Sequence, residues 1–119
     1  MFEASSDTIV REMEEEISTR IKVLRLLWVV ENFFEYFGKR LHEIAFYYQM
    51  KLPEDSPFRN VGVDFTGQEG EITLLFHWFP IDQIDTVRLY PTFLRTALKA
   101  LPDSPVHIIH VDDPKELAV

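Results

Sequence analysis

Four glutamates near the start of the chain form its densest group of chemically active side chains. Residues suited to a helix N-cap precede them (Ser5, Ser6 and Asp7), so the glutamates are expected early in a helix, where the dipole favours acids. Two interpretations stay open. The carboxylates form a solvated helix flank, or they imitate nucleic-acid phosphates and fill the basic groove of a partner. The four residues are Glu12, Glu14, Glu15 and Glu16.

The four histidines do not predict a metal centre. His107 and His110 lie an odd number of residues apart on an expected strand, which directs their rings to opposite faces. His42 and Glu43 are not followed by a second histidine one helical turn later, so the helical zinc-protease pattern is absent. The chain has no cysteine, which excludes disulfides and thiolate zinc sites. We therefore predict no metal site and no cofactor.

Motifs for catalysis are also missing. The chain has four glycines, and none of them belongs to a glycine-rich phosphate loop. Asp64 is interpreted as a solvated residue, and the run Asp112, Asp113 and Pro114 is interpreted as a capped turn. The sequence therefore assigns no catalytic residue, and it does not favour an enzyme.

Aromatic side chains make up 13% of the chain, which is more ring surface than a small domain easily buries. Such rings concentrate at the centres of protein contacts. A symmetric homodimer through long helices would cover them. A hydrophobic ligand pocket between helices and sheet is the competing interpretation. The rings assigned to the contact surface are those of Trp28, Phe34, Tyr36 and Tyr47.

Length and charge restrict the class of protein. A chain of 119 residues predicts a single domain over residues 1–119. The net charge of −8 repels phosphate backbones and anionic lipid, so we expect no direct nucleic-acid or membrane binding. The most apolar stretch, residues 23–37, contains three charged side chains and is too short for a membrane span. The first residues do not resemble a secretion signal, which predicts a cytoplasmic protein.

Apolar spacing predicts a helical part over residues 6–52. Ile9, Met13, Ile17 and Ile21 recur at four-residue steps, and similar spacing continues toward Pro53. A single helix of about 45 residues would be about 65 Å long, wider than a compact domain of this size. We therefore expect two helices with a break near Gly38 or around residues 20–22, and one continuous helix stays open.

The rest of the chain predicts a linker and a sheet. Residues 53–60 collect turn-forming residues, and residues 61–119 form the sheet-plus-helix part. The resulting class is α+β, with a small, mostly antiparallel sheet of three to four strands and the order α(α)-β-β-(β)-α-β. The expected elements are a hairpin (strands 61–65 and 71–79, turn 66–70), a short strand 86–90, a helix 91–101 and a last strand 106–111.

These features predict a small acidic protein-binding module without enzymatic activity, of the inhibitor, immunity, adaptor or chaperone type. It would engage a protein partner, such as a nucleic-acid-binding protein, through its glutamates and aromatic rings, as a homodimer. The alternative is a small-ligand-binding protein or enzyme with a cavity between sheet and helices. In that case His77, His107 or Asp112 would lie at the cavity mouth.

Overall fold

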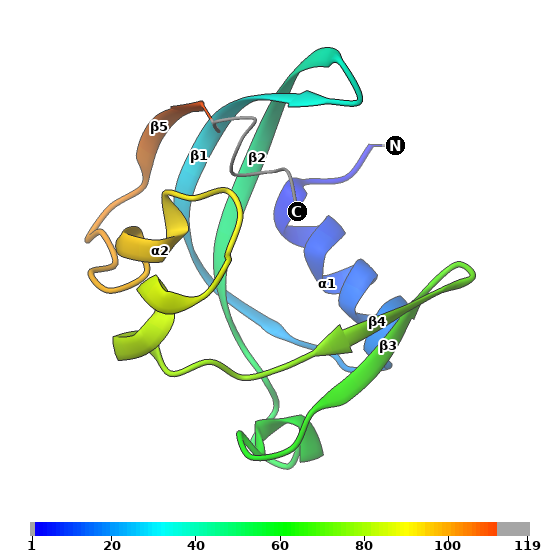
Figure 1. Cartoon of the computed structure of the whole chain (residues 1–119). Helices are drawn as coiled ribbons and strands as arrows, with labels where there is room; N and C mark the ends of the chain where they lie inside the picture. Colours follow the sequence, from blue (N-terminus) through cyan, green and yellow to red (C-terminus); the bar gives the residue numbers. More distant parts are fainter. Residues whose placement is uncertain (1, 112–119) are drawn as a thin grey trace. The chain divides into compact units, whose positions relative to one another are not determined.

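One long helix is followed by strands and short helical turns in the computed structural model, which describes residues 2–111 (Figure 1). This composition confirms the α+β class. The longest helix is α1 (Ser5–Ile17), and the short helical segments are η1 (Pro57–Arg59), η2 (Ile81–Thr86) and α2 (Leu94–Ala97). The strands are β1 (Lys22–Tyr36), β2 (Lys39–Lys51), β3 (Phe65–Glu69), β4 (Ile72–Phe76) and β5 (Val106–Val111).

The chain is divided into two compact units, each with a core of its own. The first unit extends to Arg25 and resumes over Tyr48–Phe79. The second unit contains Leu26–Tyr47 and the chain from Pro80 onward. Across residues 2–111, no helix combines the length and hydrophobicity that crossing a bilayer requires.

The first unit packs α1 against the β3–β4 hairpin (Figure 1). Met13 and Ile17 lie on the buried face of α1, which confirms the predicted apolar stripe within this helix. Aromatic rings continue the core through the hairpin, because Phe65 stacks on Phe58 and Phe76 with ring centroids 4.2 and 4.8 Å apart. Burial of these apolar groups against one another positions the hairpin on the helix.

A glycine permits the close approach of β3 to α1. A Cβ atom on Gly67 would lie 2.6 Å from the carbonyl oxygen of Glu16 and 2.8 Å from Cγ2 of Ile17, which real side chains essentially never do. Alternate residues of a strand share a face, so Phe65, Gly67 and Glu69 all lie on the same side of β3. The contact at Gly67 therefore brings Glu69 toward the C-terminal part of α1.

The second unit contains β5 and most of β1 and β2, which form a three-stranded sheet in the order β2-β1-β5. Phe37 and Gly38 form the two-residue turn between β1 and β2, and both have the positive φ of a type I′ hairpin turn (49° and 75°). β5 pairs in parallel with β1, from Trp28 opposite Val106 to Phe33 opposite Val111. The core of this unit consists of Leu27, Trp28, Val30 and Leu94.

The predicted helical part is wrong beyond Ile17. Residues 22–36 and 39–51, expected as helix, form β1 and β2. Large apolar side chains lie at neighbouring positions of β1, including Leu27 and Trp28, and such runs match a helical spacing by chance. The expected break between two helices is therefore wrong as well: Gly38 lies in the turn between β1 and β2, and the segment around residues 20–22 connects α1 to β1.

The predicted sheet elements are confirmed in part. The last strand, residues 106–111, has its expected bounds, and the hairpin exists, but its turn lies at Gly70 and Glu71 and not over residues 66–70. Residues 66–69 belong to β3 because their backbone pairs with β4. The short strand expected at 86–90 is absent from the described structure, and α2 covers only part of the helix expected at 91–101. The linker contains the helical turn η1.

The end of α1 supports a stability prediction. Ser18 ends the helix in the left-handed conformation (φ 52°, ψ 36°), with its amide donating to the Glu14 carbonyl oxygen. A Cβ atom is strained there, and glycine is not. Ser18→Gly should therefore raise the free energy of unfolding by about 0.5–1 kcal/mol in urea denaturation. Ser18→Ala keeps the Cβ atom and serves as the control, so an equal gain in both variants would contradict the explanation.

Candidate functional site

The four glutamates of α1 do not share one face of the helix. At about 100° per residue, Glu12, Glu15 and Glu16 fall within one sector of α1, and Glu14 falls on the other side. Glu14 forms an ion pair with Arg20 at 3.0 Å, away from the other three. The predicted glutamate cluster therefore separates into a group of three carboxylates and one paired residue.

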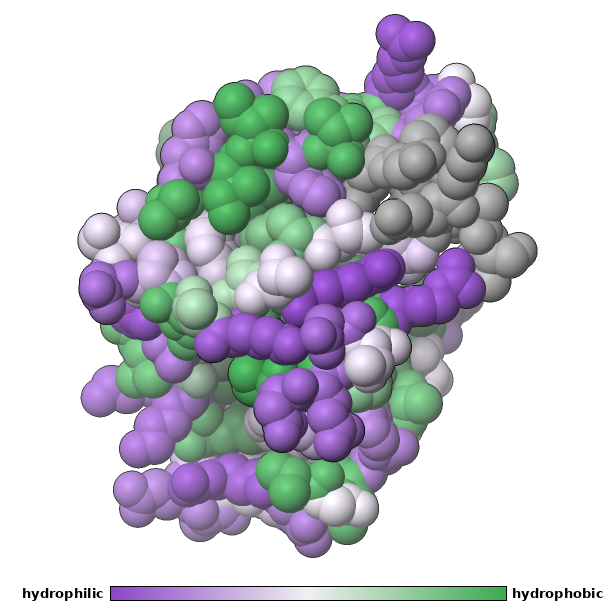
Figure 2. All heavy atoms as spheres, turned by 60° about the vertical axis from the view of Figure 1, so that its left-hand side comes forward, coloured by the Kyte–Doolittle hydropathy of each residue, from purple (hydrophilic) through white to green (hydrophobic). Residues whose placement is uncertain are grey.

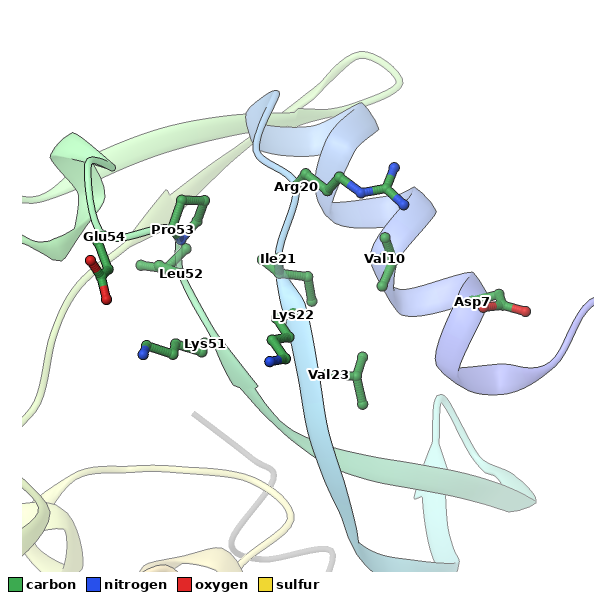
Figure 3. Close-up of a pocket in the computed structure, with 10 residues that line it drawn as sticks. All are labelled: Asp7, Val10, Arg20, Ile21, Lys22, Val23, Lys51, Leu52, Pro53 and Glu54. Atoms are coloured by element: carbon green, nitrogen blue, oxygen red, sulfur yellow. The ribbon is translucent and has the colours of Figure 1, made fainter.

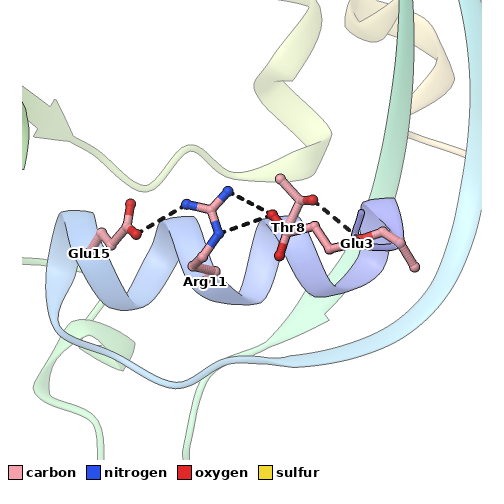
Figure 4. Close-up of polar contacts among 5 residues, drawn as sticks. Glu3, Thr8, Arg11 and Glu15 are labelled. Atoms are coloured by element: carbon pink, nitrogen blue, oxygen red, sulfur yellow. Dashed lines mark hydrogen bonds and ion pairs between the residues drawn. The ribbon is translucent and has the colours of Figure 1, made fainter. Parts of the chain in front are cut away.

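Arg11 holds two carboxylates at the edge of this group (Figure 4). Its guanidinium donates from Nη2 to Oε1 of Glu3 at 2.7 Å and from Nε to the same oxygen at 3.0 Å. A third bond runs from Nη1 to Oε1 of Glu15 at 3.1 Å, across one turn of α1. The planar fork of arginine suits this double pairing, and it restrains the Glu15 side chain.

The pairing predicts a change of pKa. The hydrogen bond from Arg11 lowers the pKa of the Glu3 carboxyl. Its stabilising contribution is therefore present above the unfolded-state pKa and is lost as the pH falls through the folded-state value. Arg11→Met should raise the pKa of Glu3 toward its ordinary value, measured by NMR titration of the side-chain carboxyl carbon. Arg20→Met, which removes the partner of Glu14, should leave Glu3 unchanged, and a shift there would contradict the assignment.

Glu16 is the carboxyl of this group whose pKa is raised. Partial burial raises the pKa of its carboxyl, and repulsion from Glu69, Glu12 and Glu15 raises that pKa further. Three of these four groups come from α1, and Glu69 comes from β3 across the contact at Gly67. Neighbouring carboxylates that repel one another are the usual setting for a hard divalent cation, which relieves the repulsion.

The donor set fits magnesium better than a metal held by protein alone. Within residues 2–111, no three histidine, aspartate or glutamate side chains already converge on a common point. Magnesium is usually held by one or two carboxylates, with water and substrate phosphates completing its shell. The carboxylates around Glu16 supply oxygen donors, which is the kind of donor that magnesium takes.

The first unit also has a hollow, which lies on a different side of α1 from the carboxylate group (Figure 3). It has a volume of about 600 Å³. Asp7 lies at its edge, about 180° around the helix from Glu16 at 100° per residue. Its polar lining includes Arg20, Lys22 and Lys51, and Figure 3 shows both lysines extending from the strands below α1. The hollow is therefore separate from the carboxylate group.

Comparison with known proteins gives the family of the chain. The NUDIX domain matches residues 2–101, which include α1, Glu69 and almost the whole described structure. The chain belongs to the NUDIX domain family. No curated protein matches the chain significantly.

Membership of the NUDIX family overturns the predicted function. The chain is not a non-enzymatic protein-binding module of the inhibitor or adaptor type, because a NUDIX domain points to a hydrolase of the nucleoside diphosphate type. The alternative of an enzyme agrees better with this finding. The physical reason for the error is that glutamates on a helix have the same sequence pattern whether they are solvated or gathered around a cation.

Sequence reasoning did not single out three residues that the structure places in or beside the carboxylate group: Glu3, Arg11 and Glu69. Glu69 was assigned to a turn, and its position beside Glu16 depends on the tertiary contact at Gly67. Arg11 had a usable signal, because an arginine four residues before Glu15 on a helix predicts an ion pair.

The aromatic residues assigned to a contact surface all belong to the second unit of the NUDIX chain. Trp28 is only 4% exposed, and its ring packs edge-on against Tyr47 and Phe93. Phe34 is half-buried, and Tyr36 is exposed next to Phe37. Trp28 is therefore a core residue, and for the others a role in partner binding stays a prediction.

Two of the four histidines of the NUDIX chain, His42 and His107, contact the same carboxylate, that of Glu31, and His42 does so at 3.3 Å. His107 contacts Glu31 at 2.8 Å, and His110 contacts Thr92 at 3.1 Å, as expected for rings on opposite faces of β5. His77 contacts Asp64 at 2.6 Å in the first unit. Of the residues placed at a cavity mouth by the alternative interpretation, Asp112 lies outside the described residues, and His77 lines a small pocket.

Proposed function

We propose that the chain is a divalent-cation-dependent hydrolase that cleaves the phosphoric anhydride of a nucleoside diphosphate or a derivative of one. The observation that carries the proposal is the raised pKa of Glu16, caused by burial and by three neighbouring carboxylates on the helix and strand of a NUDIX domain. A diphosphate needs its negative charge neutralised before a nucleophile can approach, and these carboxylates suit the cation that does so.

The residues of the site have distinct roles in this proposal. Glu16, with Glu12, Glu15 or Glu69, would hold magnesium, which when bound supplies positive charge to the diphosphate oxygens. Arg11 restrains Glu15 through its hydrogen bond and so keeps that carboxylate oriented. Glu3 accepts the other two bonds of Arg11 and fixes the guanidinium in turn.

The proposal is tested by direct assay of hydrolysis. The full chain is incubated with magnesium and a panel of nucleoside diphosphates, sugar nucleotides and dinucleotides, and the products are identified by phosphorus NMR. We expect release of a nucleoside monophosphate from at least one compound, and no release when the metal is chelated. A folded protein that cleaves none of the panel with magnesium or manganese would refute the proposal.

We also propose that the chain forms a homodimer. A homodimer is supported by large apolar side chains that reach the surface, among them Phe37 and Ile109, and Figure 2 shows such groups between hydrophilic ones. Light scattering at micromolar concentration tests it, and a strict monomer would exclude it. Binding to a further protein and a cytoplasmic location stay proposals, the latter supported by the absence of cysteine from the sequence.

A further inference from the structure

A small apolar pocket of the first unit lies next to the carboxylate group. It has a volume of about 130 Å³, and two of its lining residues, Met13 and Ile17, lie on α1 beside Glu16. Its remaining lining residues are Met50, Leu52, Phe65, Phe76, His77 and Trp78. His77 is the one member of this set whose side chain can both accept and release a proton, so the pocket presents one candidate for proton transfer.

His77 is held by a carboxylate. Its Nδ1 lies 2.6 Å from Oδ1 of Asp64, and its ring packs against Phe79 with centroids 4.5 Å apart. The β3–β4 ladder ends at the pair Phe65–Phe76, and Asp64 and His77 are the residues directly beyond this pair on the two chain segments. The end of the hairpin ladder therefore brings the two residues close together, and their side chains make the contact.

The contact determines which nitrogen of His77 is available. A carboxylate accepts a hydrogen bond and cannot donate one when ionised, so Asp64 selects the tautomer with hydrogen on Nδ1. The lone pair then lies on Nε2, which has the form required of a general base. An aspartate that orients a histidine through Nδ1 is an established arrangement for activating a nucleophile.

We propose that His77 is the general base of the hydrolysis and that Asp64 is its positioning residue, which rests on the proposed function. Nε2 of His77 takes a proton from water while the water oxygen forms a bond to one phosphorus of the diphosphate. The bond from that phosphorus to the bridging oxygen breaks, and the leaving phosphate keeps the electron pair. The proton then passes from His77 to the leaving group or to solvent, so the net reaction consumes one water.

The test compares alanine variants of two histidines with wild type, on a compound that wild type hydrolyses with magnesium. His77→Ala should lower kcat by about 10²-fold with little change in KM, and added imidazole should restore part of the lost rate. His107→Ala is the matched control, because its ring lies on β5 in the second unit, and it should keep its activity. Undiminished turnover in His77→Ala, or a loss that imidazole does not rescue, would overturn the assignment.

Asp64→Asn tests the positioning role. Asparagine leaves the size of the side chain unchanged but can donate to Nδ1, which favours the tautomer with hydrogen on Nε2. We expect kcat to fall while KM is kept, together with a tautomer change in the nitrogen NMR spectrum of His77. An unchanged tautomer with lost activity would overturn the role of Asp64. Failure of wild type itself to hydrolyse the panel would instead refute the proposed function, so the two failures are distinguishable.

Discussion

Replacing Glu16 with glutamine should lower kcat/KM for nucleoside diphosphate hydrolysis by about 10³-fold, or about 4 kcal/mol of transition-state stabilisation. Glutamine keeps the size of the side chain and removes the charge that would hold the cation. The loss should appear at saturating magnesium in steady-state assays, and magnesium affinity should fall in isothermal titration calorimetry. The effect is expected to be large because Glu16 is the carboxylate on which Glu69 of β3 and both Glu12 and Glu15 of α1 act electrostatically.

A measurement of stability distinguishes the expected loss of activity in Glu16→Gln from misfolding. The pKa of Glu16 is raised, so its ionised form is disfavoured in the folded state, and stability falls as the pH rises from the unfolded-state pKa toward the folded-state one. At neutral pH, Glu16→Gln removes this repulsion and should leave the protein at least as stable as wild type. Glu14→Gln is the matched control on the same helix and should keep its activity, because Glu14 pairs with Arg20 outside the group. Equal activity losses in both variants would contradict the proposed site.

Gly67→Ala should destabilise the fold by about 2–3 kcal/mol and reduce hydrolysis as well. The added methyl group would lie 2.6 Å from the backbone oxygen of Glu16 and 3.0 Å from Cε2 of Phe76, so either α1 or β3 must move. Because Glu69 follows two residues later on the same face of β3, that movement separates Glu69 from Glu16. Urea denaturation measures the first effect, and the NMR-determined pKa of Glu16, which should fall, measures the second.

A second glycine supplies the comparison for this variant. A Cβ atom on Gly62 would meet only Oδ1 of Asn60 at an ordinary 3.6 Å, so Gly62→Ala should cost nothing in packing. It should stabilise the protein slightly, by about 0.4–1 kcal/mol, through a less flexible unfolded chain. Similar unfolding midpoints for the two alanine variants would show that the close approach of β3 to α1 does not limit the side chain at position 67, and would contradict the prediction.

Local sequence patterns determined several elements of this NUDIX chain correctly. The apolar stripe of α1, the existence of the β3–β4 hairpin and the bounds of β5 each depend on neighbours within one element, and such short-range signals are present in the residues themselves. The glutamates of α1 were also singled out from the sequence, and their assignment to partner binding stays a prediction.

Tertiary structure alone decided the rest. Residues 22–51 became β1 and β2 because strand pairing and burial against other elements override an apolar spacing that also fits a helix. The site likewise depends on distance in space. Glu69 acts electrostatically on Glu16 where Gly67 lets two backbones approach, and Asp64 contacts His77 just beyond the last pair of the hairpin ladder. Electrostatic repulsion and proton transfer act between groups that are close in space, and a linear sequence does not specify that closeness before the chain has folded.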